Sequence, residues 1–365
     1  MPKLERKRRI ALPARPRILV IALRRLGDVL LTTPLISSLR SAWPDAAIDA
    51  LVFADTAGIL RGHPDLNGIV EMPPDGTAFQ SFMLARKLWR RYDLAVSTQS
   101  GDRPTFFALV AGKRSVAPVE SRFSGCVKRW LLSRSVEQVP GIHRVEEMMR
   151  LADALGIARA PLVIGPKPRD ASLAPPGRYA VIHAAPQFRY KQWTVDGWRA
   201  LASALVERGL TVLVTGGPSA AERAYLDDIW AGAGMPVTRI DGTLDWAQLA
   251  GLLAKARVYI GPDTSVTHLA AATGCPTVAL YGPTDPRLWG PWPVGELDEP
   301  WAAAGRVQQR GNVWLVQNPL PCMPCQLEGC ERRLGSYSAC LNELSPVRVI
   351  QAVEQALELS PTRRA

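Results

Sequence analysis

The chain has 365 residues, 47% of them apolar and 21% charged, and its formal net charge is +11. This composition is that of an ordinary globular protein, and the length predicts two domains. No stretch of about 18 uninterrupted apolar residues occurs, which excludes a transmembrane helix.

The excess positive charge lies in the first half of the chain. Residues 1–178 carry 28 Lys and Arg against 16 Asp and Glu, whereas residues 179–365 carry 16 against 17. A basic field on one half indicates an anionic partner such as nucleic acid, a membrane surface or an anionic lipid. A solvated surface with a basic tail over residues 1–16 is the alternative interpretation.

The first half alternates strand-like and helix-like segments. The apolar run Arg17–Leu23 is typical of a buried parallel strand. It is too short for a signal peptide and lacks a cleavage site, so a cytoplasmic location is expected. Further strands are predicted at 48–53, 68–72 and 94–98, and helices at 30–43, 56–61, 79–91 and 143–155. These segments predict an N-terminal domain over residues 17–165.

Residues 166–178, rich in Pro and Gly, predict a linker. The pattern then restarts in a C-terminal domain over residues 179–345, and a last helix with a tail follows over 346–365. Strands are predicted at 179–183, 210–215, 258–261 and 277–281, and helices at 194–208, 219–230, 245–255 and 265–273. The alternation predicts two α/β domains with doubly wound parallel sheets, and functional loops at the carboxyl ends of the strands.

Several motifs of nucleotide-binding and hydrolytic enzymes are absent. No G-x-G-x-x-G follows a strand, and there is no G-x-x-x-x-G-K-[ST], H-E-x-x-H or G-x-S-x-G. Their absence argues against a dinucleotide dehydrogenase and a P-loop kinase. The loop after the first strand, Arg24–Asp28, instead ends in a carboxylate at the start of a helix. Asp28 is either an N-cap or a general base that faces an interdomain cleft.

Polar residues also follow three strands of the second half. Arg189 and Lys191 are placed to reach a phosphate, and Trp193 to anchor their loop. Glu222, one turn into a helix, is suited either to bind ribose hydroxyls or to stabilise the helix start. Asp263 and Thr264 stand at the mouth of another helix, where unpaired N–H groups and the helix dipole favour a phosphate.

Taken together, these segments resemble the ADP-heptose:lipopolysaccharide heptosyltransferases, glycosyltransferase family 9. The resemblance extends from about residue 17 to 357. It is carried by Gly27-Asp28 with DVLLTTPLISSLR, by Lys191-x-Trp193, and by GPDTSVTHLAAATGCPTVALYGPTDP. The segments DVLLTTPLISSLRSAWPDAAIDALVFADTAGIL and YDLAVSTQSGDR look most like the heptosyltransferase III type, which adds a side-branch heptose to the inner core.

The resemblance implies a GT-B fold of two facing Rossmann-like domains, with the acceptor in the N-terminal one and the donor, ADP-heptose, in the C-terminal one. It implies an inverting glycosyltransferase that requires no cofactor or metal. Asp28 matches the catalytic base of the family, Lys191 its phosphate-contacting lysine and Glu222 its ribose-binding acid. The donor-binding signature matches Asp263, Thr264, Ser265, His268 and Gly282.

The resemblance also accounts for the distribution of charge. The lipopolysaccharide core of Gram-negative bacteria is acidic and is built at the inner face of the cytoplasmic membrane, which suits a basic, peripheral acceptor domain. The candidate acceptor contacts are Arg24, Arg25, Arg103 and Arg122. The helix that carries Arg86, Lys87, Arg90 and Arg91 beside Trp89 either touches the membrane or is an ordinary amphipathic helix.

Four of the six cysteines, Cys322, Cys325, Cys330 and Cys340, are spaced C-x2-C-x4-C-x9-C. The start of this pattern has the spacing of metal ligands, and four converging thiolates would hold a structural zinc or an iron–sulfur cluster. The alternative is that these cysteines are buried or free thiols without a metal.

Two alternative functions stay open, and a third lacks support. The first is that of a heptosyltransferase II or another family member with a different nucleotide sugar. The second is that of a non-catalytic homologue that binds sugar nucleotides or lipid. The carboxylate of Asp28 argues against the non-catalytic homologue. Nucleic-acid binding through the basic half lacks any recognition motif, so no nucleic-acid partner is expected.

Overall fold

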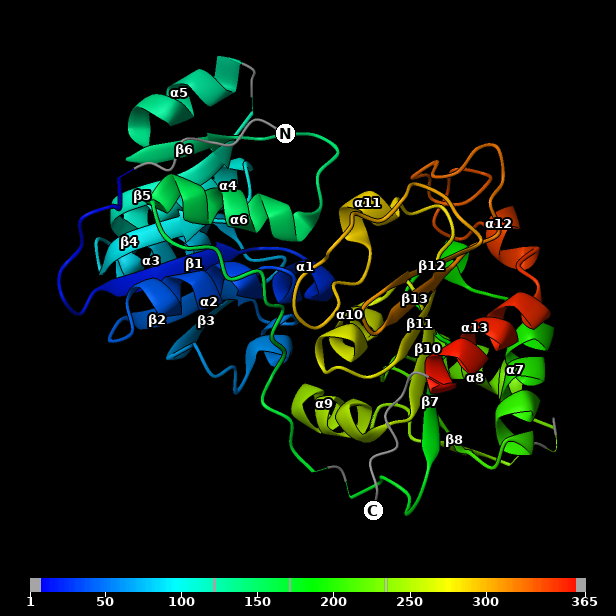
Figure 1. Cartoon of the computed structure of the whole chain (residues 1–365). Coiled ribbons are helices and arrows are strands. Elements are labelled where there is room, and N and C mark those ends of the chain that lie inside the picture. Colours follow the sequence, from blue (N-terminus) through cyan, green and yellow to red (C-terminus); the bar gives the residue numbers. More distant parts are fainter. Residues whose placement is uncertain (1–7, 121–122, 171, 233, 235, 359–365) are drawn as a thin grey trace. The chain divides into compact units, whose positions relative to one another are not determined.

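The computed structural model describes residues 8–120, 123–170, 172–232, 234 and 236–358. The chain divides into two compact units, Met1–Pro166 and Lys167–Ala365. Each unit is a sheet covered by helices on both faces (Figure 1). The two units are described separately below.

The N-terminal unit contains a six-stranded, wholly parallel sheet with the strand order β3-β2-β1-β4-β5-β6. Its strands are β1 (Arg17–Ala22), β2 (Ala47–Phe53), β3 (Gly68–Met72), β4 (Tyr92–Ser97), β5 (Gly112–Val119) and β6 (Arg134–Glu137). The chain order reverses between β1 and β4. In such sheets, ligands bind outside the carboxyl ends of the strands at the point of reversal.

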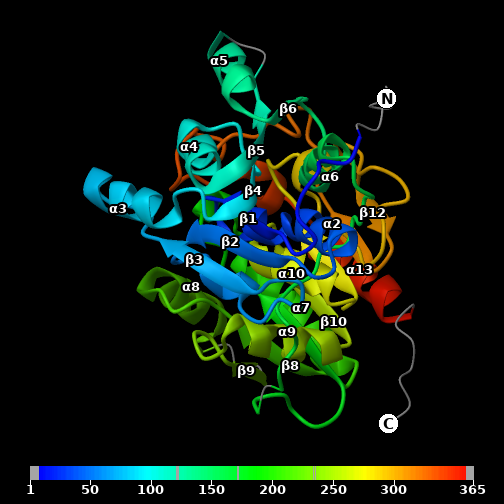
Figure 2. The same cartoon turned by 90° about the vertical axis from the view of Figure 1, so that its left-hand side faces the viewer.

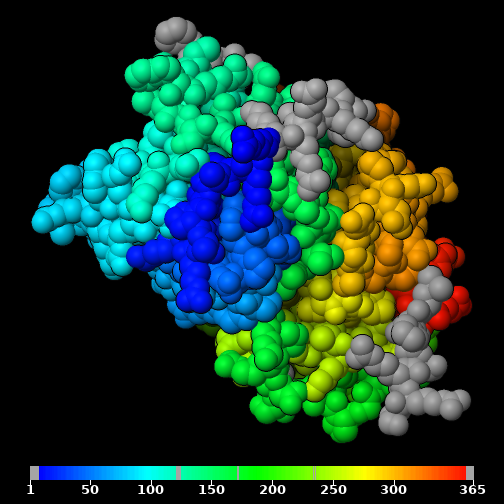
Figure 3. Space-filling view, turned by 60° about the vertical axis from the view of Figure 1, so that its left-hand side comes forward, coloured from blue at the N-terminus to red at the C-terminus, as the bar shows by residue number. Residues whose placement is uncertain are grey.

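Helices cover both faces of this sheet. They are α1 (Leu26–Leu30), α2 (Thr33–Ala42), a 3-10 helix η1 (Ala57–Leu60), α3 (Ala78–Leu88), α4 (Asp102–Ala111), α5 (Phe123–Leu131) and α6 (Arg144–Leu155). Figure 2 shows α2 and α6 on one side of the strands and α3 and α4 on the other. The α3 helix projects from the surface of the unit (Figure 3).

The C-terminal unit contains a seven-stranded sheet with the order β12-β13-β11-β10-β7-β8-β9. Its strands are β7 (Tyr179–His183), β8 (Thr211–Thr215), β9 (Val237–Arg239), β10 (Val258–Pro262), β11 (Thr277–Leu280), β12 (Val307–Arg310) and β13 (Val313–Val316). Only β12 runs antiparallel to its neighbour. The chain order reverses between β7 and β10, so a ligand site is expected at their carboxyl ends.

The helices of this unit bury most of the sheet. They are η2 (Arg189–Lys191), α7 (Val195–Glu207), α8 (Ala220–Trp230), α9 (Trp246–Lys255), α10 (Ser265–Ala272), α11 (Pro286–Trp289), α12 (Ala339–Asn342) and α13 (Pro346–Glu358). The apolar sides of α7, α8 and α13 share one core with β7, β8, β10 and β11. The C-terminal helix therefore packs as part of this unit.

The structure differs from the sequence prediction in several places, including the strands β9 and β13, which were not predicted. The helix predicted at 30–43 is two helices that meet at Leu31-Thr32, because α1 begins earlier, at Leu26. The helix predicted at 79–91 ends at Leu88, since Arg90 adopts a left-handed backbone with φ 48°. The region from 98 to 143 contains α4, β5, α5 and β6, none of which was predicted. The second sheet is not wholly parallel, because the polar edge strand β12 pairs antiparallel with β13.

Part of the expected basic tail is packed against the N-terminal unit. Ile10 is buried, and its N–H donates to the carbonyl of Leu155 at 3.0 Å. The guanidinium of Arg9 lies 4.5 Å from the centre of the Trp43 ring. Among the described helices, none is long and apolar enough to cross a membrane.

Candidate functional site

The C-terminal unit joins two loops where the strand order reverses. Lys191, in the short η2 helix after β7, reaches Asp263, the residue that follows β10. The ammonium Nζ of Lys191 donates to Asp263 Oδ2 at 2.5 Å and to the Asp263 carbonyl at 3.3 Å. An ammonium group has three donors, so one N–H of Lys191 is left for a ligand.

The carboxylate of Asp263 is a buried anion held by three neighbours. Its side chain is 8% exposed. The hydroxyl of Thr284 donates to Oδ2 at 2.7 Å, and His268 Nε2 lies 3.9 Å from Oδ1. Burial alone would raise the pKa of Asp263, but the Lys191 ammonium, with His268 and Thr284, outweighs burial and holds the pKa below its usual value. Asp263 is therefore an organising anion, already neutralised by Lys191.

The α10 helix begins directly beside this pair. Thr264 is its N-cap, and its hydroxyl accepts from the Thr267 N–H at 3.5 Å. The Thr267 hydroxyl bonds to the Pro262 carbonyl at 2.5 Å, which fixes the end of β10 to the first turn of the helix. Ser265 is the first helical residue and is partly exposed. Because first-turn N–H groups have no partner within a helix, this end is suited to an anion.

A long segment near the C-terminus supports both loops, and we call residues 320–344 the bracing segment. Its Ser338 hydroxyl donates to the Tyr190 carbonyl at 2.6 Å, and the Gln326 N–H donates to the Pro283 carbonyl at 2.8 Å. The Leu344 carbonyl accepts from Trp193 Nε1 at 2.9 Å. The Lys191 loop and the Thr284 loop are thus held from the same side, and Trp193 anchors its loop as predicted.

Gly282 has a packing role in this arrangement. A Cβ atom at this position would lie 2.8 Å from Leu341 side-chain atoms and 3.4 Å from Cys340 Sγ. The bracing segment therefore occupies the space of any side chain at Gly282.

Two further residues lie at the ends of β7 and β8. Glu222, in the first turn of α8, accepts from the Gly217 N–H through Oε2 at 2.6 Å. One of its oxygens therefore fixes the loop between β8 and α8. His183, at the end of β7, has Nδ1 3.1 Å from the Thr215 hydroxyl. Burial lowers the pKa of His183 to about 4, so this imidazole is neutral near pH 7.

In the N-terminal unit, the structure shows that Asp28 is not a helix cap. The N-cap of α1 is Arg25, and Asp28 lies within the first turn. Its Oδ1 is buried and has no hydrogen-bond partner in the described part of the chain, and Arg24 Nη1 is 4.0 Å away. The N-cap hypothesis is therefore wrong, and Oδ1 of the carboxylate accepts no hydrogen bond from the described residues, with the Arg24 guanidinium as its ion-pair neighbour.

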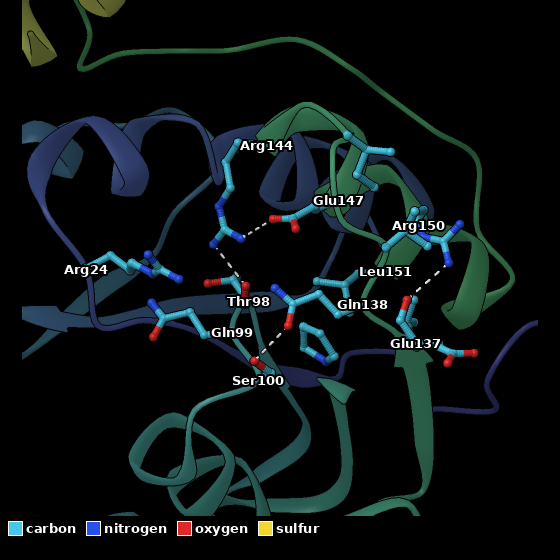
Figure 4. Close-up of a pocket in the computed structure, with 14 residues that line it drawn as sticks. Arg24, Thr98, Gln99, Ser100, Glu137, Gln138, Arg144, Glu147, Arg150 and Leu151 are labelled. Atoms are coloured by element: carbon cyan, nitrogen blue, oxygen red, sulfur yellow. Dashed lines mark hydrogen bonds and ion pairs between the residues drawn. The ribbon is translucent and has the colours of Figure 1, made fainter. Parts of the chain in front are cut away.

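A pocket lies at the carboxyl ends of this unit's strands, as the strand order predicts. Arg24 follows β1, Gln99 and Ser100 follow β4, and Gln138 follows β6, while Arg144 begins α6 (Figure 4). Arg144 is 5% exposed, and its Nη1 donates to Glu147 Oε2 at 2.6 Å while Nη2 donates to the Thr98 carbonyl at 2.9 Å.

Two buried donors of this pocket are unused. Neither Gln99 Nε2 nor Arg144 Nε has a hydrogen-bond partner among the described residues. Buried donors without partners are costly, so such atoms commonly mark a ligand or water site. Neither Gln99 nor Arg144 was identified from the sequence as a site residue, although Gln99 stands in the YDLAVSTQSGDR segment that resembles the family. Thr284 was also missed as a site residue, although it stands in the GPTDP segment that resembles the family.

The structure separates the candidate acceptor arginines. Arg24 lines the pocket, whereas Arg25 is exposed at the start of α1. Arg103 is not a pocket residue: it donates to the Pro74 carbonyl at 3.3 Å and lies 5.6 Å from the centre of the Phe53 ring. Arg122 lies outside the described residues.

The four spaced cysteines lie in the bracing segment. Cys340 is buried, and its pKa is raised to about 12, mainly by burial and further by Cys325, Cys330 and Cys322. The thiols are therefore neighbours. Within the described residues, however, no group of three or more His, Cys, Asp or Glu side chains is arranged to hold a metal ion.

Comparison with known proteins finds similar chains over most of the sequence. The sequence profile of glycosyltransferase family 9 (heptosyltransferase) matches residues 81–297. Lipopolysaccharide heptosyltransferase 3 of Escherichia coli K12 is 29% identical over 290 residues, which are 74% of this chain and 83% of the relative. Lipopolysaccharide heptosyltransferase 1 of Pseudomonas aeruginosa is 28% identical over 383 residues, covering 95% of this chain and 100% of the relative.

A solved structure establishes the fold class. The structure of E. coli heptosyltransferase WaaC with ADP superposes with a TM-score of 0.72 at 20% sequence identity, covering 93% of this chain and 99% of WaaC. This likeness confirms the predicted GT-B fold with two α/β domains.

Proposed function

The chain belongs to glycosyltransferase family 9, the heptosyltransferases, and we propose that it transfers a heptose from ADP-heptose to the inner core of lipopolysaccharide. It is a glycosyltransferase by family membership. The functions of its relatives from E. coli and P. aeruginosa support the acceptor class, and the ADP bound by WaaC supports the nucleotide. The observation that carries the proposal is the Lys191–Asp263 pair at the mouth of α10.

This pair is suited to the pyrophosphate of the donor. The donors that would contact the pyrophosphate are the third N–H of Lys191 and the backbone N–H groups of Thr264 and Ser265. Asp263 holds the Lys191 ammonium in place. Charge builds on the departing diphosphate as the glycosidic bond breaks, and preorganised donors stabilise that charge. Glu222 has one carboxylate oxygen on Gly217, and we assign its other oxygen to a ribose hydroxyl.

In the proposed reaction, Asp28 is the general base. A hydroxyl of the acceptor attacks the anomeric carbon of the heptose, its proton passes to Asp28, and ADP leaves from the opposite side, so the configuration inverts. The unpartnered, buried Oδ1 of Asp28 is the atom that would accept this proton. Arg24, which lines the pocket and is 45% exposed, would contact an anionic group of the core, because the enclosed cavity of about 30 Å³ has room for only one or two waters.

The deciding experiment is Asp28→Asn, which keeps the shape of the side chain and removes its basicity. We expect transfer from ADP-heptose to fall by at least about 100-fold, the usual contribution of a general base, while ADP binding measured by calorimetry is unchanged. Asp45→Asn, at an exposed aspartate of the same unit, is the matched control. Full turnover by Asp28→Asn would remove Asp28 from the base role.

Two alternatives differ in substrate or activity. A heptosyltransferase II, or a member with a different donor, would be revealed by a panel of ADP-, GDP- and UDP-sugars. A non-catalytic homologue would bind ADP-heptose without turning it over. Mass spectrometry of core oligosaccharide from a strain lacking the protein tests the heptosyltransferase III assignment, which predicts loss of a single side-branch heptose.

We also propose a peripheral location at the inner face of the cytoplasmic membrane. The basic first half of the chain supports it, since that leaflet and the inner core are anionic. The same excess of Lys and Arg would keep the acceptor unit close to its lipid-linked substrate.

A further inference from the structure

We propose that one face of the N-terminal unit, formed by α3, α4 and α5, docks on an anionic lipid bilayer; we call it the outer helical face. Its exposed apolar side chains are Phe79, Phe82, Met83, Trp89, Phe106, Val127, Trp130 and Leu131. Its exposed cations are Arg86, Lys87, Arg90, Arg91 and Arg129. This face would be the part of the protein that contacts the membrane, and the inference rests on the proposed function only for the choice of leaflet.

The α3 helix is apolar on two sides, although only one is needed for packing. Ala85 and Leu88 face inward and join the core of the sheet. Phe79, Phe82 and Met83, spaced by three and four residues, form a stripe on the outer side and are 70%, 63% and 44% exposed. Folding of the unit does not account for this second stripe.

The end of α3 places an aromatic ring among cations. The helix ends at Leu88, and the left-handed backbone of Arg90, whose N–H donates to the Val110 carbonyl at 2.9 Å, turns the chain sharply. Trp89 is left 64% exposed at this turn. None of the four cations from Arg86 to Arg91 forms an ion pair with another described residue. Tryptophan beside Lys and Arg is typical of the interfacial layer of a bilayer.

The α5 helix repeats this arrangement. Leu132, at its end, packs inward with Val119. Val127, Trp130 and Leu131 point outward and are 52%, 85% and 49% exposed. Lys128 pairs with Asp102 at 2.7 Å, so a charge contact ties α5 to the start of α4. The outward stripe of α5 therefore belongs to the same face as α4, whose Phe106 is 48% exposed.

The concentration of these side chains argues for a single docking surface. Of the 16 large apolar side chains that are exposed among the described residues, eight lie on this face, including every phenylalanine and every tryptophan of the set. Scattered exposed apolar residues need no explanation, but an aromatic cluster on one face does. Figure 3 shows α3 in cyan and α5 in blue-green at the surface of the unit.

Charge favours a lipid surface as the occupant. From Ala78 to Arg91, the chain carries four cations and no acid. On α5, Lys128 pairs with Asp102 and Arg129 with Glu137, so the excess positive charge of this face comes from the α3 segment. Basic residues around exposed aromatic rings match an anionic bilayer, because lipid headgroups attract the cations while the rings enter the interface. A protein partner or a second copy of this chain is an outcome of the test below.

The test measures partitioning of the full-length protein onto vesicles of phosphatidylglycerol and phosphatidylethanolamine, with phosphatidylcholine vesicles as the neutral comparison. The double variant Phe82→Ser/Trp130→Ser should weaken binding to the anionic vesicles by about tenfold or more, because each ring loses its burial in the interface. Arg86→Gln/Arg90→Gln should weaken it by roughly fivefold per charge, an effect that added salt removes.

The matched control is Val347→Ser/Leu334→Ser, which removes two exposed apolar side chains from the C-terminal unit and should leave binding unchanged. Equal loss in the control, or unchanged binding in the Phe82/Trp130 variant, would overturn the proposal. The proposal would also be overturned if the wild-type protein were a dimer that did not bind vesicles and the Phe82/Trp130 variant were a monomer. The assay contains neither donor nor acceptor, and transfer to a detergent-solubilised acceptor should be unaffected by the variant. Failure of the docking surface is therefore distinguishable from failure of the proposed reaction.

Discussion

The pair between Lys191 and Asp263 should be one of the strongest single interactions in the C-terminal unit. The perturbation is a double-mutant cycle of Lys191→Met, Asp263→Asn and the two together. The charged atoms are 2.5 Å apart, and the two side chains are 21% and 8% exposed. Each single variant leaves its partner's charge in a site shielded from water.

The expected size follows from that burial. Removing one partner of a buried ion pair costs about 3–5 kcal/mol. Lys191 keeps some contact with water, so Asp263→Asn should lie at the lower end, about 3 kcal/mol. Lys191→Met leaves a more deeply buried carboxylate and should cost about 4 kcal/mol. The double variant strands neither charge, so it should cost less than Lys191→Met alone, and the coupling energy should exceed about 3 kcal/mol.

Urea unfolding followed by tryptophan fluorescence measures this coupling. The control cycle uses Lys255 and Asp170 in the same unit, which are also 2.5 Å apart but 60% and 86% exposed, and it should show no measurable coupling. The pKa of Asp263 is depressed, so its contribution is present above the unfolded-state pKa of about 3.9 and is lost as the pH falls through the lower folded-state value. The coupling should therefore be the same at about pH 7 and about pH 5. A coupling no larger than that of the exposed pair would refute this reasoning.

Two other predictions concern neighbouring residues. The pKa of His183 is lowered to about 4 by burial, so its neutral form contributes stability that is fully present above about pH 6.5 and lost as the pH falls toward 4. Between about pH 6.5 and about pH 4, the free energy of unfolding of His183→Asn should fall by up to about 3 kcal/mol less than that of the wild type, measured by urea titration. The same pH dependence in both proteins would contradict this prediction. A Cβ at Gly217 would lie 2.3 Å from Glu222 Oε2. Gly217→Ala should therefore displace that carboxylate and weaken ADP binding by about tenfold in calorimetry. The control is Gly335→Ala, because a Cβ at Gly335 meets open space. An ADP affinity of Gly217→Ala equal to that of the wild type would remove Glu222 from the nucleotide site.

The sequence predicted strands that are continuous apolar runs better than strands that contain polar residues. The strands β1, β7 and β10 are short apolar runs, and they lie where they were expected. The strand β5 was missed because it begins with exposed Lys113 and Arg114 and contains Pro118, so its polar start hides a buried end. The edge strand β12 reads as a polar loop, and only its pairing with β13 makes it a strand.

The candidate site divides in a similar way. Lys191 and Asp263 were identified separately, each from its place after a strand, but only the folded sheet shows that they pair, because 72 residues separate them. From the sequence, Asp28 was as consistent with an N-cap as with a general base. The observed start of α1 at Leu26 excludes the N-cap. Gln99 and Arg144 were not identified from the sequence, since what marks them is a buried donor without a hydrogen-bond partner among the described residues, and residue type does not show this.

The bracing segment has a consequence for protein engineering. It contains little regular structure, and a designer would regard such a stretch as free to lengthen or label. Its backbone and side chains, however, hold the Lys191 loop through Ser338 and the Thr284 loop through Gln326. Its longest exposed stretch is residues 330–335. A fluorophore or short affinity tag belongs within that stretch, where it would report on the Lys191 and Thr284 loops without displacing the contacts that hold them.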